Sequence, residues 1–433
     1  MNKSKTIMQA LALGLALVFF VAPVGAADLP RAEPEEVGLS AERLARIDDF
    51  MQAHIDKGHV AAMQILVARH GKVAYFNSAG VRDLDSGAPV KDDTIFRLYS
   101  QTKPVTSVAI MMLYEEGKLR LTDPVSKFLP DLKGLEVYVS GEGDDMVTEP
   151  ASREVTIHDL LTHRSGFTYY FLADTPVARL YGERGINPNG LTADDDAGLK
   201  DVDLAEFIRR LGTVPLNHQP GTEWHYGVSL DVLGRVVEVA SGQTLDVFFE
   251  EHIFEPLGMV DTAFFVPEDK LDRFTVNYSS GPDGQLVVAD PINGVFASKP
   301  ALLSGGAGLA STSADYFQFA QMMLNKGEWN GVRLLSQKSV EYMTTDHLPK
   351  DQKLGFFKGV GFGLGVGVLV DPIARQGLGS VGEFSWGGAA STDWFASPAD
   401  DVVVLFMTQL LFNQKYPFGA DLRRLVYQSI EGE

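Results

Sequence analysis

The sequence predicts a mixed α/β (α+β) fold in which strands from both ends of the chain share one sheet and helices lie between them. Two apolar runs joined by His-Gly-Lys in residues 61–81 predict a β-hairpin near the start. Apolar runs from residue 359 onward predict further strands near the end. The middle of the chain carries mainly helical patterns. We therefore expect the final strands to pair with the opening hairpin.

Residues 1–26 have the layout of a secretory signal peptide. Two lysines precede an unbroken apolar stretch, and small residues precede an expected cleavage near Ala26. The apolar part is short for a membrane span, which disfavours the alternative of an uncleaved anchor. No later stretch approaches membrane-spanning length. We therefore expect a periplasmic or secreted protein whose mature chain is residues 27–433.

The composition excludes several classes of function. The chain has no cysteine, which excludes disulfides, a thiolate nucleophile and a cysteine metal site. Its formal net charge is −20, and such a surface repels nucleic acid and anionic lipid, so neither is expected as a partner. With 45% apolar residues, the chain exceeds one small core. We expect one unit of two closely packed subdomains.

Helical patterns flank the opening hairpin and continue through the middle of the chain. Residues 40–58 have a serine cap and apolar residues at helical spacing. Residues 102–119 predict a buried helix with proline in its first turn and Gly117 as its stop. Residues 155–169 predict a short helix that runs into a glycine turn, and residues 229–259 contain two more.

The last third of the chain predicts one more helix and then strands. A capping box over residues 312–315 begins the helix. Residues 359–370 predict one strand, because glycines alternate with large apolar residues. Residues 391–398 and 401–409 predict two further strands, and a helix over 420–430 ends the chain.

A serine and a lysine three residues apart lie where an extended run turns into the 102–119 helix. Ser100-Gln101-Thr102-Lys103 is the only Ser-x-x-Lys in the chain. Residues three apart share a helix face, so the amine can reach the hydroxyl. The helix N-terminus favours developing negative charge, and burial favours the neutral amine that accepts the serine proton. The alternative is a helix-capping serine beside a solvated lysine.

Other enzyme motifs do not occur in the sequence. No H-E-x-x-H or other recognisable metal pair is present among the nine histidines, so no metal is expected. The G-x-S-x-G elbow of α/β-hydrolases is absent. The glycines of residues 359–370 lack the spacing of a dinucleotide fingerprint. We expect His163 and His225 to be local hydrogen-bonding residues rather than catalysts.

The chain resembles the serine β-lactamase and penicillin-binding superfamily, in particular class C-like proteins and the family VIII carboxylesterases. The resemblance covers about residues 33–430 and implies a β-lactamase/DD-peptidase-like antiparallel sheet flanked by helices, with an inserted, mainly helical subdomain. It rests on six segments in the family's order: SQTKP (100–104), LLTHRSG (160–166), EWHYGVSLDVLGRVVE (223–238), IFEPLGM (253–259), GGAGLAST (305–312) and WGGAAST (386–392).

The resemblance implies an acyl-enzyme hydrolase and a role for individual residues. Ser100 matches the family nucleophile and Lys103 its partner base. Tyr226 matches the tyrosine that carries the proton to the leaving group and helps to activate water. The backbone N–H groups of Ser100 and Ala389 match the oxyanion hole. The alternative for Tyr226 is a half-buried aromatic residue with no role in catalysis.

Two departures from the family pattern bear on the substrate. Val228 stands where class C enzymes carry asparagine, and valine cannot make that amide contact. Trp386-Gly387-Gly388 stands where β-lactamases and peptidases carry Lys-Thr-Gly, as in many family VIII esterases. The missing lysine would hold the carboxylate of a β-lactam or peptide, and a charge-assisted bond contributes about 1.5 to 3 kcal/mol. A core aromatic residue is the alternative for Trp386.

We therefore expect one catalytic domain with an α/β subdomain (about 33–100 and 300–433) and a helical subdomain (about 101–299). It should hydrolyse small, neutral, short-acyl carboxylic esters without a cofactor. A class C-like β-lactamase or D-alanyl carboxypeptidase is the alternative within enzymes, and a catalytically inactive, penicillin-binding-like sensor is the alternative of another class. Two acidic stretches, residues 140–154 and 182–203, are expected as surface loops.

Overall fold

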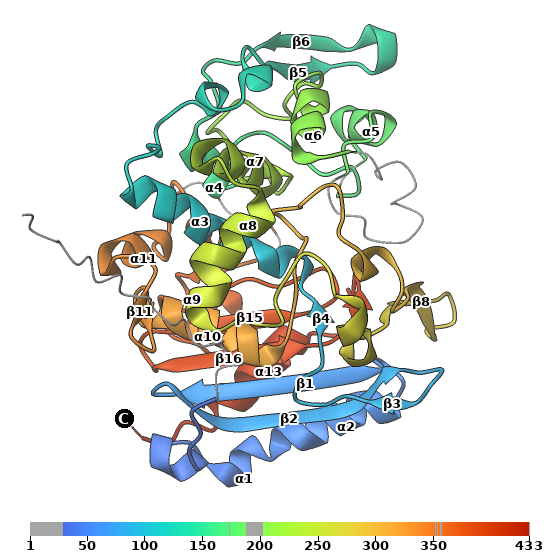
Figure 1. Ribbon diagram of the computed structural model, residues 1–433, viewed down its shortest axis with the longest axis vertical. Helices are drawn as coiled ribbons and strands as arrows, with labels where there is room; N and C mark the ends of the chain where they lie inside the picture. Colours follow the sequence, from blue (N-terminus) through green and yellow to red (C-terminus); the bar gives the residue numbers. More distant parts are fainter. Residues whose placement is uncertain are drawn as a thin grey trace, which may run out of the picture.

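One antiparallel sheet of eight strands organises the lower half of the molecule (Figure 1). The computed structural model describes residues 29–432, except 173, 188–201, 351, 353 and 356. The expected signal peptide therefore lies outside the described residues. In spatial order the strands are β12 (Val360–Phe362), β13 (Gly367–Leu369), β14 (Phe384–Ser385), β15 (Asp393–Ser397), β16 (Val402–Met407), β1 (Ala62–Arg69), β2 (Lys72–Asp83) and β3 (Ala88–Pro89).

Strands from the two ends of the chain meet at the centre of this sheet, as predicted. β1 pairs with β2 in the opening hairpin and with β16 on its other side, with Leu66 opposite Leu405. Every residue of β16 is buried, because both faces of the sheet are covered. Ile65 and Val67 contribute to one core cluster, whereas Leu66 contributes to the other. This alternation follows from the two-residue period of a strand.

Helices cover both faces of the sheet. α2 (Arg46–Asp56) and α13 (Phe418–Tyr427) pack on one face, and α10 (Ser313–Leu324) packs on the other against β15 and β16. The helices of the middle of the chain lie above the sheet in Figure 1. They are α3 (Lys103–Glu115), α4 (Ile157–Leu161), α5 (Pro176–Glu183), α6 (Leu204–Leu211), α7 (Ser229–Ser241), α8 (Leu245–Phe249) and α9 (Glu255–Leu257). Of these helices, α5, α6 and α7 lie toward the top.

Smaller elements complete the described chain. α1 (Ala41–Leu44) precedes α2, and α11 (Gln337–Met343) and α12 (Pro372–Arg375) flank β12 and β13. The short strands pair locally, and only β17 with β7 is parallel among these pairs of the described chain. They are β4 (Phe96–Arg97) with β9 (Ala310–Ser311), β5 (Glu136–Ser140) with β6 (Val147–Pro150), β7 (Asn277–Ser280) with β8 (Leu286–Asp290) and β17 (Leu410–Leu411), and β10 (Glu328–Trp329) with β11 (Val332–Arg333).

One local prediction was wrong. The single strand expected over residues 359–370 is a hairpin, because Gly365 takes a φ of 79° and its missing Cβ makes room for the Ser107 hydroxyl. The helix expected over 40–58 begins after its serine cap, as predicted, and is interrupted only at Ala45 between α1 and α2. The stretch 140–154 lies at the surface, as predicted, and forms much of the β5–β6 hairpin.

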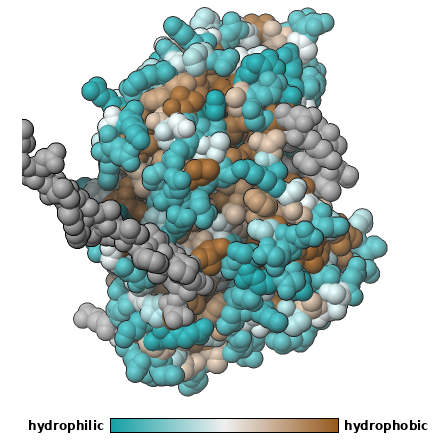
Figure 2. Space-filling view, viewed as in Figure 1, coloured by the Kyte–Doolittle hydropathy of each residue, from teal (hydrophilic) through white to brown (hydrophobic). Residues whose placement is uncertain are grey.

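The surface of the molecule is mixed in polarity. Figure 2 shows polar residues over most of one face, with apolar residues in separate patches. None of the helices in the described part of the chain is long and apolar enough to cross a membrane.

Candidate active site

Ser100 lies in a tight 3-10 turn that leads into α3. The residue before it, Tyr99, has a left-handed backbone with a φ of 46°, which is costly for a side chain of this size. Tyr99 is fully buried, and its hydroxyl accepts a hydrogen bond from Asn277 Nδ2 at 2.9 Å. The strained turn is therefore held by the core, and Ser100 itself remains half-buried beside the first residue of α3.

Lys103 lies directly beneath Ser100 and has no exposed surface. Its Nζ donates to Ser100 Oγ at 3.0 Å, which confirms the contact expected from the Ser-x-x-Lys spacing. Two further acceptors lie within reach of the amine: the Tyr169 hydroxyl at 3.1 Å and the Gly306 carbonyl at 2.8 Å. The alternative of a solvated lysine is thus wrong.

Tyr226 joins the same cluster from the segment before α7. Lys103 Nζ lies 4.7 Å from the centroid of its ring. The Tyr226 hydroxyl accepts a hydrogen bond from Trp386 Nε1 at 3.3 Å. The next residue must be glycine, because a Cβ on Gly227 would come within 2.4 Å of the Phe167 carbonyl oxygen. This close approach fixes the backbone that carries Tyr226.

The Trp-Gly-Gly turn lies beside the segment that precedes Ser100. A Cβ on Gly388 would come within 2.1 Å of the Leu98 carbonyl oxygen, and Thr392 Oγ1 donates to the same oxygen at 3.3 Å. Ala389, the predicted second oxyanion donor, follows Gly388 on this turn and is half-buried like Gly387. The structure therefore brings the two segments of the predicted oxyanion hole together.

Val228 is placed differently from the other predicted site residues. Its side chain is fully buried and belongs to the main hydrophobic core beside α7. The residue forms the N-cap of α7 without a side-chain hydrogen bond. This placement does not support the predicted contact between Val228 and a substrate.

Three residues at the centre of the site were missed by sequence reasoning. Tyr169 and Gly306 are hydrogen-bond partners of Lys103, and Asp231 accepts a bond from the Gly306 N–H at 3.0 Å. Gly306 and Asp231 fall within the segments that carry the family resemblance. A signal for Asp231 was available, because a carboxylate in an otherwise apolar helix face is costly unless it has partners.

The two histidines near Tyr226 behave differently. His225 hydrogen-bonds Thr168 Oγ1 at 2.9 Å, as expected for a local structural residue, and burial lowers its pKa to about 4. His163 packs 4.6 Å from the Tyr226 ring, and burial lowers its pKa well below the usual range. Within the described residues, neither ring nitrogen of His163 has a hydrogen-bond partner, so the expected local hydrogen bond of that side chain is wrong.

Aromatic side chains form two walls around the cluster. On one side, Trp386 packs against Phe362 and Phe357 with ring centroids 5.1 and 6.1 Å apart. On the other side, Tyr169 stacks on Phe171 at 5.0 Å, and Phe171 packs against Phe412 at 5.6 Å. These walls give the site an apolar lining.

Phe412 connects the second wall to the oxyanion turn. Its backbone N–H donates to the Ala389 carbonyl at 2.8 Å, and its φ is 52°. The side chain is 49% exposed, so the wall extends to the surface.

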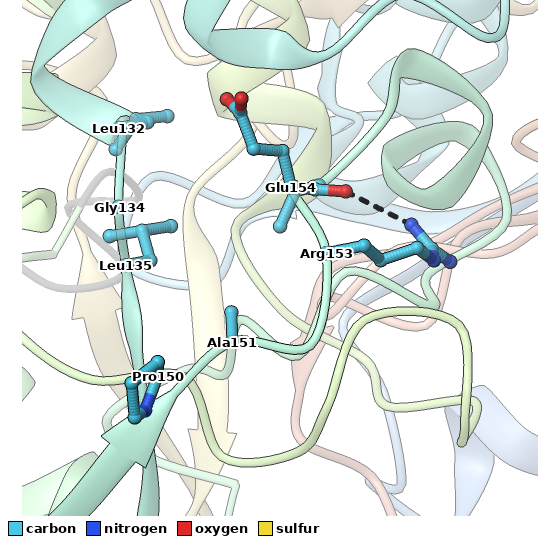
Figure 3. A pocket seen from close by; sticks show the side chains of 8 residues that line it. Leu132, Gly134, Leu135, Pro150, Ala151, Arg153 and Glu154 are labelled. Atoms are coloured by element: carbon cyan, nitrogen blue, oxygen red, sulfur yellow. Dashed lines mark hydrogen bonds between the residues drawn. The ribbon is translucent and has the colours of Figure 1, made fainter.

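A separate cavity of about 210 Å³ lies at the base of the β5–β6 hairpin (Figure 3). Leu132, Leu135 and Ala151 give it apolar sides, while Arg153 and Glu154 lie at its edge. None of its lining residues belongs to the Ser100 cluster. Within the described chain, no group of three or more histidine, aspartate or glutamate side chains is arranged to hold a metal ion.

The antiparallel sheet and the Ser–Lys–Tyr cluster define a class of serine acyl-transfer enzyme. Comparison with known proteins agrees, because the beta-lactamase family model matches residues 47–428. The chain therefore belongs to the beta-lactamase family, within the serine β-lactamase and penicillin-binding superfamily.

Three known proteins are similar to this chain over most of its length. An uncharacterized protein of Mycobacterium tuberculosis is 37% identical over 363 residues, covering 82% of this chain and 87% of that protein. Esterase EstB of Burkholderia gladioli is 31% identical over 416 residues, covering 91% and 98%. The structure of EstCE1, a hydrolase with promiscuous acyltransferase activity, is 27% identical with a TM-score of 0.74, covering 89% and 99%. EstB and EstCE1 support hydrolase activity of the esterase kind.

Proposed function

We propose that the protein is an exported serine carboxylesterase that hydrolyses short-acyl esters through an acyl-enzyme on Ser100. One observation carries the proposal: a fully buried Lys103 amine lies 3.0 Å from the Ser100 hydroxyl. The contact places the amine where, in its neutral form, it can accept the serine proton. No cofactor is needed for this chemistry.

The proposed acylation moves one proton through two side chains. Ser100 Oγ attacks the ester carbonyl while its proton passes to Lys103 Nζ. The carbonyl oxygen becomes an anion that the N–H groups of Ser100 and Ala389 stabilise. Collapse of this intermediate breaks the bond to the alcohol, and Tyr226 gives the alkoxide a proton that Lys103 restores. Water then attacks the acyl-enzyme with the same groups acting in reverse, and the acid leaves.

The lining of the site supports a neutral substrate. Trp386 offers an apolar ring, and its N–H already donates to the Tyr226 hydroxyl. It therefore supplies no cation where a lysine would hold a substrate carboxylate. The acidic net charge of the chain disfavours anionic substrates in the same direction.

A comparison of substrates tests the proposal. Purified protein should cleave p-nitrophenyl butyrate rapidly and nitrocefin slowly, and activity should fall along a series of p-nitrophenyl esters of increasing acyl length. Rapid nitrocefin turnover with negligible ester cleavage would instead favour a class C-like β-lactamase. Release of D-alanine from a peptide would favour the carboxypeptidase alternative.

Single variants test the role of Ser100. Ser100→Ala should lower kcat by about 10⁴-fold or more and should abolish labelling by a fluorophosphonate probe. Ser107→Ala is the matched control, because Ser107 lies on the same helix, and its hydroxyl donates to the Lys103 carbonyl at 3.0 Å rather than to Ser100 or the Lys103 amine. This variant should keep both activity and labelling. Equal labelling of wild type and Ser100→Ala would favour the inactive sensor.

Acyl transfer is a second candidate, because the related EstCE1 is described as a hydrolase with promiscuous acyltransferase activity. In this reaction an alcohol replaces water in the second half of the cycle. Adding a primary alcohol to the butyrate assay should yield the new ester if the site admits the acceptor. Export is tested by N-terminal sequencing of the protein recovered from the periplasm or medium, which should begin near residue 27.

A further inference from the structure

A fully buried carboxylate lies in the first turn of α7. Asp231 Oδ1 accepts hydrogen bonds from Ser304 Oγ at 2.5 Å and from the Gly306 N–H at 3.0 Å. Its second oxygen, Oδ2, has no hydrogen-bond partner in the described part of the chain. Burial raises the pKa of the Asp231 carboxyl, and the charge of Lys103 opposes this shift. In the described part of the chain, the Asp231 and Lys103 side chains form no ion pair with each other.

The loop of residues 304–308 connects Asp231 with Lys103. On its α3 side, Thr106 Oγ1 donates to the Gly305 carbonyl at 2.6 Å, and Lys103 Nζ donates to the Gly306 carbonyl at 2.8 Å. On its α7 side, the loop holds the two donors to Asp231. One short loop thus carries contacts to both groups.

Glycine is required for the loop to fit between α3 and α7. A Cβ on Gly305 would come within 2.5 Å of the Leu230 carbonyl oxygen. A Cβ on Gly306 would come within 2.6 Å of Asp231 Oδ2. The two glycines therefore let the backbone lie directly against Asp231, and any movement of that side chain displaces the Gly306 carbonyl.

We propose that Asp231 is a positioning residue for the lysine base: through this loop it aims the Gly306 carbonyl at Lys103 Nζ. The proposal rests on the proposed roles of Ser100 and Lys103. Asp231 contacts neither Ser100 nor the oxyanion turn in the hydrogen bonds of the described chain. Its effect on the reaction must therefore pass through Lys103.

Other titratable groups also face Lys103. The Tyr169 hydroxyl and the Tyr226 ring contact the amine from the segment after α4 and the segment before α7. His163 lies close enough for the lysine charge to lower its pKa further. Asp231 bonds Ser304 and Gly306 rather than any of these groups, so variants of Asp231 test the path through the loop.

Two variants test the hydrogen bonds that Asp231 accepts. Asp231→Asn keeps an oxygen for Ser304 and Gly306, so the Gly306 carbonyl should stay aimed at Lys103 Nζ. For p-nitrophenyl butyrate, kcat should then fall by less than about tenfold. Asp231→Ala removes the acceptor oxygen, and kcat should fall by about 100-fold with KM within a factor of about three.

Asp315→Asn is the matched control. Asp315 is also buried, and its pKa is raised to about 7 by burial, but its partners are the Asp261 N–H and the Thr262 hydroxyl. This variant should lower the unfolding temperature without lowering kcat. Fluorophosphonate labelling of wild type separates the two proposals, because absence of labelling contradicts the role of Ser100 itself. Given labelling, a wild-type kcat in Asp231→Ala, or equal losses of kcat in Asp231→Asn and Asp231→Ala, overturns the role of Asp231.

Discussion

Trp386 is the residue to which we assign the proposed preference for esters over β-lactams. Its ring packs against Phe362, and its N–H donates to the Tyr226 hydroxyl at 3.3 Å. This hydrogen bond positions the proposed proton carrier. The indole adds no positive charge to the pocket.

Trp386→Lys should change the substrate preference. The ammonium group restores a partner for a substrate carboxylate, so the ratio of nitrocefin to p-nitrophenyl butyrate turnover should rise by about 10- to 100-fold. Trp386→Phe is the control, because it removes the N–H donor and keeps an aromatic ring. It should lower ester turnover by about tenfold without raising nitrocefin turnover. Equal ratios in the two variants would contradict the assignment of Trp386 to the carboxylate position.

At the scale of single residues, the sequence predicted contacts that depend on local geometry. The Ser100–Lys103 contact follows from helical spacing alone. The contact of Lys103 with the Gly306 carbonyl depends on how a distant loop packs between two helices, which no local pattern encodes. Tyr169 was missed for the same reason. Val228 was assigned to the substrate pocket from an alignment of motifs, whereas the structure turns its side chain into the core.

At the scale of elements, the segment that carries Tyr226 depends on one glycine. A Cβ on Gly227 would overlap the Phe167 carbonyl oxygen, so the backbone before α7 cannot keep its path with any other residue. Gly227→Ala should lower the free energy of unfolding by about 2 to 4 kcal/mol and should reduce ester turnover further than the stability loss explains. Denaturant titration and kcat measure the two effects.

Gly182→Ala serves as the control for Gly227→Ala. Gly182 lies within α5, and an added Cβ would meet no atom within 4 Å. Alanine is the better helix former, so this variant should raise the free energy of unfolding by about 0.5 to 1 kcal/mol. Similar destabilisation by both substitutions would show that the close approach at Gly227 has no special effect.

Element predictions succeeded where periodicity and packing agree. The opening hairpin, α3 and the late strands β15 and β16 lie where their patterns place them. The strand expected over residues 359–370 failed because its alternating glycines also permit a turn, and packing against α3 and α11 selects that turn. Sequence periodicity could not distinguish the two, since both conformations suit glycine.

At the scale of the whole molecule, buried histidines should make stability depend on pH. Burial lowers the pKa of six histidines, so the folded protein binds fewer protons than the unfolded chain below the usual pKa of 6.5. The contribution of these histidines to the free energy of unfolding is fully present above pH 6.5. This contribution is lost as the pH falls below 6.5. These residues are His54, His59, His158, His163, His225 and His347.

His225 allows this dependence to be measured. With a pKa lowered to about 4, it alone should cost about 2 kcal/mol of unfolding free energy between pH 7 and pH 5. Urea titrations at the two pH values should show a smaller decrease in His225→Gln than in wild type. His70→Gln is the control, because His70 lies exposed in the β1–β2 turn. If the unfolding free energy of His225→Gln falls between pH 7 and pH 5 by as much as that of wild type, the prediction is contradicted.

The overall architecture was predictable because a buried strand needs a pairing partner along each of its two edges, and the chain has strand patterns at both ends. The place of the long helical insertion followed from its patterns, but the packing of its loops around Lys103 did not. The central position of β16, between β15 and β1, has a consequence for how the chain folds. β1 is synthesised early, whereas its partner β16 is synthesised near the end of the chain. The sheet can therefore be completed only after nearly the whole chain has been made. A chain cut before Val402 would leave β1 with an open edge that invites aggregation.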